Sequence, residues 1–240
     1  ASEMVRNSVT AGDDNYQLAA YHFIQMGKDL LSNTFLNLND VPYINFEKPW
    51  WPKSLVDDLS FGNGSYYFVS GDMSTNVLYM MHLIYINKDL FSQYQLDLPY
   101  QLVRDGKWTL DKMIELSTGR YRDADNDNVQ STKDYFGFQS MHYVVDSFYP
   151  GCNLRLVDES DTDMLVISPD YSSAKTVKLV NKLGKWAATD DVWIHNASVD
   201  PEGINGRTAY QTATKEGRVL LSLQHTALGE GYASSDWAVG

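Results

Sequence analysis

The sequence predicts an α/β protein with a mostly buried sheet, because strand-like and helix-like segments alternate along it. The strongest helix signal lies at 172–186, where apolar side chains recur at a spacing of three from Ala174 to Leu183. Ser172 or Ser173 can cap its first turn. The apolar run at 218–224 has instead the composition of a buried strand, and the run at 77–86 that of a buried strand or helix. Together these patterns indicate helices packed against a sheet.

Local signals predict the remaining elements in order. Asn63-Gly64 suits a two-residue hairpin turn, Thr109 can cap a helix, and Gly217 suits the end of one. The expected helices are 4–9, 24–33, 109–117, 143–149 and 206–217. The expected strands are 15–23, 134–139 and the two arms of a hairpin over 151–168 with an acidic turn.

Composition narrows the class of function. Charged residues make up 21% and apolar residues 43%, which is typical of a globular protein. The net charge of −12 argues against nucleic acid and anionic membranes as partners. The apolar runs are too short to cross a bilayer, and the single cysteine, Cys152, leaves the redox compartment undecided. A signal peptide is not evident, and both ends suggest a piece excised from a longer chain.

The stretch "RDADNDNVQSTKDYFGF" at 122–138 has the spacing of a calcium loop of the EF-hand type. Counting from Asp123, side-chain oxygens fall at positions one, three, five, nine and twelve. Position seven needs only a backbone carbonyl. The candidate ligands for a structural Ca²⁺ are therefore Asp123, Asp125, Asp127, Val129, Ser131 and Asp134.

Two positions depart from this pattern. Asn128 stands where the loop normally has glycine, although asparagine tolerates the left-handed conformation. Asp134 replaces the usual glutamate and has a shorter reach. The alternative is a solvated acidic loop without metal. The histidines lack the spacing of a zinc site, and the acidic pair Asp190-Asp191 has no more support than coincidence.

Several segments together resemble the extracellular solute-binding proteins of family 1, which capture ligands for carbohydrate ABC transporters. The most specific are "NKDLF" (87–91) and "GKWTLDKM" (106–113). The others are "NSVTAGDDNYQLAAYH" (7–22), "KPWW" (48–51), "GSYYFVSGDMST" (64–75), the acidic stretch ending in "DYFGF", and "EGRVLLSL" (216–223).

The resemblance implies a two-lobed periplasmic-binding-protein-like fold with ligand in the cleft between the lobes. It assigns residues 1–98 to an incomplete first lobe, 99–222 to the second lobe, and 223–240 to a segment that returns to the first. It also implies a location outside the cytoplasm, as a lipoprotein or periplasmic protein, with a membrane permease as partner and no catalysis. Missing parts of the first lobe would expose sheet edges, through which copies could self-associate.

The resemblance further implies that ligand contacts lie on loops at strand ends. Matched by segment, these positions are Tyr21, His22, Asp72, Ser74, Ser140, His142, Tyr143, His225 and Thr226. Trp50, Trp51 and Trp193 are candidate platforms for a sugar ring, because an aromatic face is flat and apolar. Trp50 and Trp51 could equally form an internal plug.

Three functions remain open at this point. The leading one is carbohydrate binding and delivery to an ABC permease. A calcium-dependent enzyme acting on glycans would need two carboxylates roughly 5 to 10 Å apart in a cleft. A non-catalytic adhesion module at the cell surface would bind no sugar ligand of this kind.

Overall fold

The computed structural model describes residues 2–20, 26, 29–30, 32–61, 64–160, 165–195 and 206–233. Packing divides the chain into two compact units. The first comprises Ala1–Val77 and Val157–Val166, and the second comprises Leu78–Leu156 and Ile167–Gly240. The predicted lobe boundaries at 98 and 222 stay a prediction.

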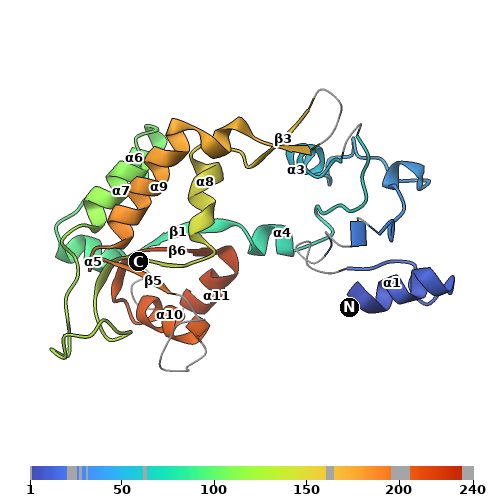
Figure 1. The fold of residues 1–240 in the computed structure, drawn as a ribbon. Coiled ribbons are helices and arrows are strands. Elements are labelled where there is room, and N and C mark those ends of the chain that lie inside the picture. The colour runs from blue at the N-terminus through green and yellow to red at the C-terminus, as the bar shows by residue number, and fades with distance from the viewer. Residues whose placement is uncertain are drawn as a thin grey trace. The chain divides into compact units, whose positions relative to one another are not determined.

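The second unit is built on a four-stranded sheet with the order β1-β6-β2-β5. The strands are β1 (His82–Ile86), β2 (Phe136–Met141), β5 (Val192–His195) and β6 (Val219–His225). β2 is central and runs parallel to both β5 and β6, whereas β1 pairs antiparallel with β6 at one edge. The strands β1, β6 and β5 of this sheet are labelled in Figure 1. The sheet is therefore mixed, and the predicted α/β class is confirmed.

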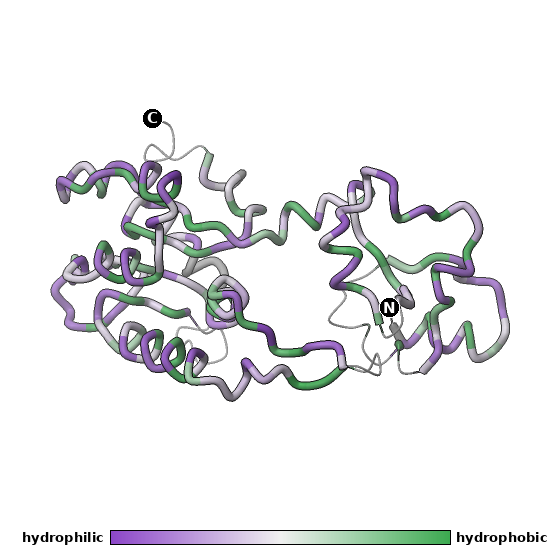
Figure 2. Tube along the Cα trace, turned by 90° about the horizontal axis from the view of Figure 1, so that it is seen from above, coloured by the Kyte–Doolittle hydropathy of each residue, from purple (hydrophilic) through white to green (hydrophobic). Residues whose placement is uncertain are grey.

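Three capped helices cover one face of this sheet. They are α5 (Lys88–Gln93), α7 (Leu110–Ser117) and α9 (Ala174–Ala187), and Asn87, Thr109 and Ser173 accept a backbone N–H at their respective N-termini. Their apolar sides meet the sheet around Phe91, Phe138 and Trp186. Purple and green alternate along the coiled segments of the tube in Figure 2, as expected of amphipathic helices. α6 (Tyr100–Arg104) and α8 (Phe148–Gly151) lie in the same unit.

Polar side chains join the opposite face of the sheet to α10 (Gly206–Lys215) and α11 (Gly229–Tyr232). The Thr214 hydroxyl donates to Oε1 of Gln139 at 2.8 Å, and the Tyr232 hydroxyl donates to Oε1 of Gln224 at 2.5 Å. Burial raises the pKa of the Tyr232 phenol well above its usual range. Gly217 follows α10 with a φ of 76°, as predicted for the end of this helix.

The first unit has little regular structure among its described residues. The helices whose bounds are described there are α1 (Ser2–Ala11), α3 (Lys53–Asp58) and the one-turn η2 (Leu38–Asp40), and α4 (Asn76–Tyr79) spans the boundary between units. β3 (Val157–Glu159) and β4 (Leu165–Ile167) form the predicted hairpin, whose acidic turn falls partly outside the described residues. Trp51 packs edge-on against Phe46, which also contacts Tyr66.

The predicted strand at 15–23 is wrong for residues 15–20, which belong to no strand. Tyr16 and Leu18 are 42% and 82% exposed there, so these apolar side chains have no core to enter. Tyr21 and His22 lie outside the described residues. Among the helices that the structure describes, none is long and apolar enough to cross a membrane.

Candidate metal site and ligand surface

The acidic loop leaves and re-enters the second unit through a short backbone ladder. Arg122 N donates to Tyr135 O at 3.1 Å, and Tyr135 N donates to Arg122 O at 3.0 Å. The Arg122 guanidinium also lies 3.8 Å from the centre of the Tyr135 ring. Because β2 begins at Phe136, the ladder attaches the loop directly to the central strand of the sheet.

Asp191 fixes the segment that precedes the loop. Its carboxylate accepts hydrogen bonds from the backbone N–H groups of Gly119, Arg120 and Tyr121 at 2.8, 2.6 and 2.7 Å. Asp191 lies immediately before β5, so one side chain connects the loop to a second strand. The sequence gives no signal for this role, because the contact joins residues about seventy positions apart.

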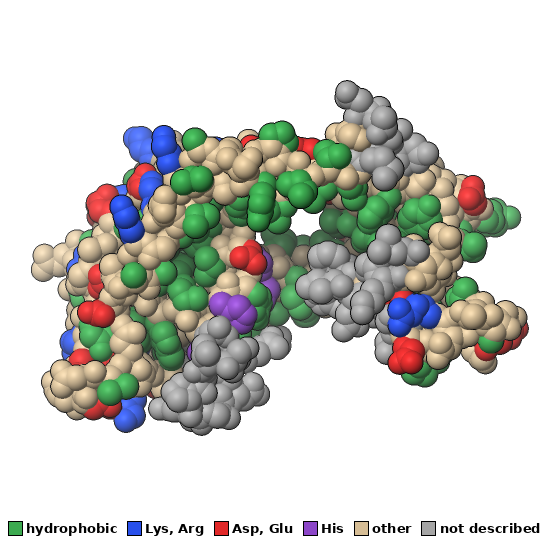
Figure 3. All heavy atoms as spheres, in the orientation of Figure 1, with side chains coloured by type: hydrophobic (Ala, Val, Ile, Leu, Met, Phe, Trp, Pro, Cys, Tyr) green, Lys and Arg blue, Asp and Glu red, His purple; other side chains and the backbone are tan. Residues whose placement is uncertain are grey.

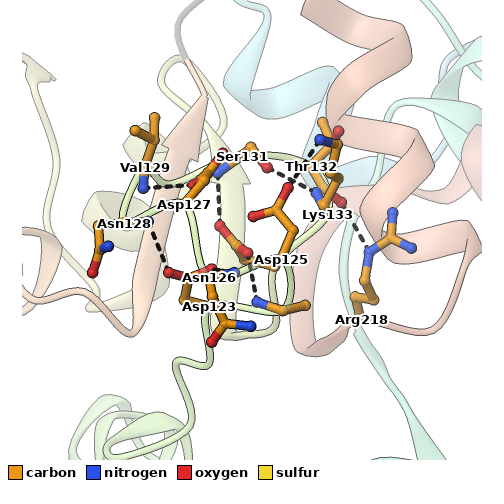
Figure 4. Close-up of polar contacts among 12 residues, drawn as sticks. Asp123, Asp125, Asn126, Asp127, Asn128, Val129, Ser131, Thr132, Lys133 and Arg218 are labelled. Carbon is orange, nitrogen blue, oxygen red and sulfur yellow. Dashed lines mark hydrogen bonds and ion pairs between the residues drawn. The ribbon is translucent and has the colours of Figure 1, made fainter.

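Asp123 organises the first half of the loop. Its two carboxylate oxygens accept from the backbone N–H groups of Asn126 at 2.7 Å and Asn128 at 2.9 Å (Figure 4). Both asparagines have a φ of 58°, in the left-handed region that asparagine tolerates better than most residues. The substitution of asparagine for the usual glycine at 128 is therefore compatible with the turn, as predicted.

Asp134 closes the second half of the loop and is fully buried. Its oxygens accept from Ala124 N at 3.0 Å and Ser131 N at 2.9 Å. One ligating oxygen from each of Asp123, Asp125 and Asp134 lies within 4.8 Å of the other two. These three carboxylates could together hold a metal ion, since hard cations favour several oxygen ligands around one point.

The other predicted ligands are not part of this cluster of three carboxylates. One oxygen of Asp127 accepts Val129 N at 2.7 Å, and Ser131 Oγ accepts Lys133 N at 3.2 Å. Asp127 is outside the cluster of three carboxylates. Its place in a six-ligand set, like that of the Val129 carbonyl and Ser131, stays a prediction.

Charge is concentrated around this loop. The Lys133 ammonium donates to Asp125 at 2.9 Å, and this bond holds the pKa of the Asp125 carboxyl below its usual range. Burial raises the pKa of the Tyr121 phenol, and the negative charges of Asp134 and Asp123 raise it further. A cation among the carboxylates would oppose that repulsion, so Tyr121 is placed to report on the charge of the loop.

A second group of candidate residues meets at the carboxyl ends of β2 and β6. The Tyr143 ring stacks on the His225 ring with centroids 6.1 Å apart, and the His142 ring meets Tyr143 edge-on at 5.4 Å. Tyr143 is 44% exposed, and His142 is also exposed. The Thr226 hydroxyl donates to Met81 O at 3.0 Å. The structure thus brings together two predicted loops, which carry His142 and Tyr143 on one side and His225 and Thr226 on the other.

Two predicted contacts are less accessible. Ser140 is fully buried within β2, and its hydroxyl donates to Leu223 O at 3.3 Å. Trp193 is half-buried, and its ring stacks on Phe136 with centroids 5.1 Å apart. One face of the Trp193 ring is therefore already covered.

The described candidates of the first unit surround a tight turn. Asp72 N donates to Trp50 O at 3.0 Å, and Ser74 N donates to Gly71 O at 2.9 Å. A Cβ on Gly71 would lie 2.5 Å from Trp50 O, so this approach requires glycine. Asp72 is exposed, and Trp50 is 48% exposed, whereas Trp51 is half-buried against Phe46.

Two histidines at the strand ends were not predicted as site residues. His82 faces His225 across β1 and β6, with ring centroids 4.6 Å apart. His195 is buried, and its backbone carbonyl accepts His142 N at 3.0 Å. Histidine side chains, in purple, gather on the face of the second unit seen in Figure 3. Sequence spacing could not reveal this group, because its members come from strands far apart in the chain.

Comparison with family models, curated proteins and solved structures finds no match to this chain.

Proposed function

We propose that this protein binds a carbohydrate and delivers it to an ABC permease without catalysis. The aromatic and histidine rings at the strand ends of the second unit would contact the sugar. The observation that carries the proposal is the ring group at the carboxyl ends of β2 and β6, in which the exposed His142 and Tyr143 pack beside the half-buried His225. Ligands of open α/β sheets bind beyond the carboxyl ends of the strands.

The chemistry of these side chains suits a sugar. Tyrosine and histidine rings combine an apolar face with a polar edge, as do the carbon and hydroxyl sides of a pyranose. Thr226 adds a hydroxyl beside them. The resemblance to family 1 solute-binding proteins supports a two-lobed architecture, a location outside the cytoplasm and a permease partner.

We further propose that the ion held by the acidic loop is Ca²⁺ and that its role is structural. Asp123 and Asp134 each accept two backbone N–H groups, so these carboxylates already shape the loop. Oxygen-only ligands suit Ca²⁺ and disfavour softer metals. Calcium should therefore raise the melting temperature relative to EDTA, because a ligand of the native state stabilises that state.

The test of sugar binding is calorimetric titration of an oligosaccharide panel into wild type, Tyr143→Ala and Tyr171→Ala. Tyr171 is also an exposed tyrosine, at 61%, and lies in the 3-10 helix Pro169–Ser172 rather than in the loops after β2 and β6, so it is the matched control. An aromatic contact contributes about 0.5–1.5 kcal/mol beyond buried area, so Tyr143→Ala should weaken binding roughly threefold or more. The control should bind as wild type.

Two results would contradict the proposal. Absence of binding to any sugar would remove the function, and a sugar that binds Tyr143→Ala as tightly as wild type would remove this surface from it. Turnover of a glycan during the titration would replace binding by catalysis.

A further inference from the structure

His82 and His225 occupy directly opposed positions on two antiparallel strands. Thr226 N donates to Met81 O, and Asn87 N donates to Leu220 O, so the odd-numbered positions of β1 are the hydrogen-bonded ones. His82 and His225 therefore form a non-hydrogen-bonded pair, in which side chains approach most closely and project from the same face.

The two imidazoles are close enough to share one ion. Their ring centroids are 4.6 Å apart and the rings are inclined by 42°. Two nitrogens bound to one zinc ion at about 2.0–2.1 Å in tetrahedral geometry are roughly 3.4 Å apart, which rings at this separation can supply after small rotations about χ. His82 is exposed, whereas His225 is half-buried with its Nδ1 covered, so an ion would approach the pair from the side of His82.

The surroundings favour the neutral imidazole of His82. Partial burial lowers the pKa of His82, and the neighbouring His225 lowers it further. A metal ligand must be deprotonated, so this environment reduces competition from protons at neutral pH. Tyr143 stacks on His225 and restricts the orientation of that ring.

We propose that His82 and His225 form a two-imidazole site for a divalent transition metal ion such as Zn²⁺. The site differs in chemistry from the acidic loop, because imidazole nitrogen favours zinc, nickel and copper, whereas carboxylate oxygen favours calcium and magnesium. The remaining coordination positions are open to water or to an oxygen ligand. This inference is independent of whether the protein binds sugar.

The test is titration of Zn²⁺, without sugar, into protein carrying Cys152→Ser in a buffer saturated with Ca²⁺. The serine removes the free thiol, and calcium competes with zinc for the carboxylates of the acidic loop. The double variant His82→Ala/His225→Ala should lose roughly 10-fold or more in zinc affinity, as expected when chelation is lost. His142→Ala is the matched control, because it removes an exposed histidine that contacts Tyr143, the residue stacked on His225.

Unchanged zinc affinity in the double variant would overturn the proposal, as would an equal loss in His142→Ala. A spectroscopic readout does not depend on affinity. Cu²⁺ bound to wild type should give an electron paramagnetic resonance spectrum with coupling to two imidazole nitrogens, and His82→Gln should give coupling to one. Identical spectra would exclude the pair as the ligands.

Discussion

Replacing Asp134 by alanine should destabilise the acidic loop more than any other single change within it. Asp134 is fully buried and accepts two backbone N–H groups, from Ala124 and Ser131. A hydrogen bond to a charged group contributes about 1.5–3 kcal/mol, which gives about 3–6 kcal/mol for two bonds. Because Ala124 is exposed, its freed N–H can bind water, so we expect the lower limit of about 3 kcal/mol.

Hydrogen exchange measured by mass spectrometry would follow this loss locally. Peptides covering 122–136 should exchange faster in Asp134→Ala, whereas peptides covering α9 should exchange as in wild type. Asp134→Asn preserves shape and one acceptor oxygen, so about half the effect is expected. A loss of stability below about 1 kcal/mol in the alanine variant would refute the contribution assigned to these two bonds.

Calcium extends the same experiment. At about 100 times its Kd, a ligand stabilises the native state by about 2.7 kcal/mol. Protection of the loop should rise by this amount in wild type and stay unchanged in Asp134→Ala. Equal protection of both proteins by calcium would show that Asp134 is not a ligand.

Three further predictions follow from the second unit. Calcium should lower the pKa of the Tyr121 phenol, because a bound cation neutralises the carboxylates whose charge raises that pKa. Alkaline absorbance titration, with Tyr121→Phe as the reference, measures the pKa. An unchanged value in calcium would count against binding in the loop. Folding lowers the pKa of His82 below its ordinary value of 6.5. As the pH falls, the unfolded chain therefore binds a proton at His82 before the folded protein does. The free energy of unfolding should accordingly decrease as the pH drops from 6.5 toward the pKa of the folded state. Urea unfolding of His82→Gln should show a weaker pH dependence in that window, and an identical dependence would contradict the burial argument. Gly137→Ala would place a Cβ 1.9 Å from Ser117 O and should destabilise the protein by about 3 kcal/mol, whereas Gly184→Ala, with no atom within 4 Å, should be neutral or stabilising in thermal melts.

Elements with local causes could be predicted from sequence. Thr109 caps α7 and Ser173 caps α9 because a hydroxyl needs only the N–H three residues later. The acidic loop was likewise predictable, because alternate side chains in one tight loop must converge. Its positive φ values fall on Asn126 and Asn128, residues that tolerate them.

Features that depend on distant residues could not be predicted. The pairing of His82 with His225 requires the register of β1 against β6, and Asp191 binds a segment about seventy residues away in the sequence. Ser140 was expected on a loop, but β2 continues to Met141 and buries it. The segment 15–23 was predicted as a buried strand, yet an apolar segment alone does not supply the neighbouring strand that would pair with it.

The ladder between Arg122 and Tyr135 has a consequence for any ion that enters the loop. Bringing together the ends of a flexible twelve-residue segment such as Asp123–Asp134 carries an entropic penalty of about 2 kcal/mol. In the folded protein two backbone hydrogen bonds already hold the ends of this segment together. Binding of an ion therefore does not carry the entropic cost of closing the loop. Binding energy from the carboxylates can therefore appear as affinity rather than as chain ordering. An isolated peptide of the same sequence would be a much weaker chelator.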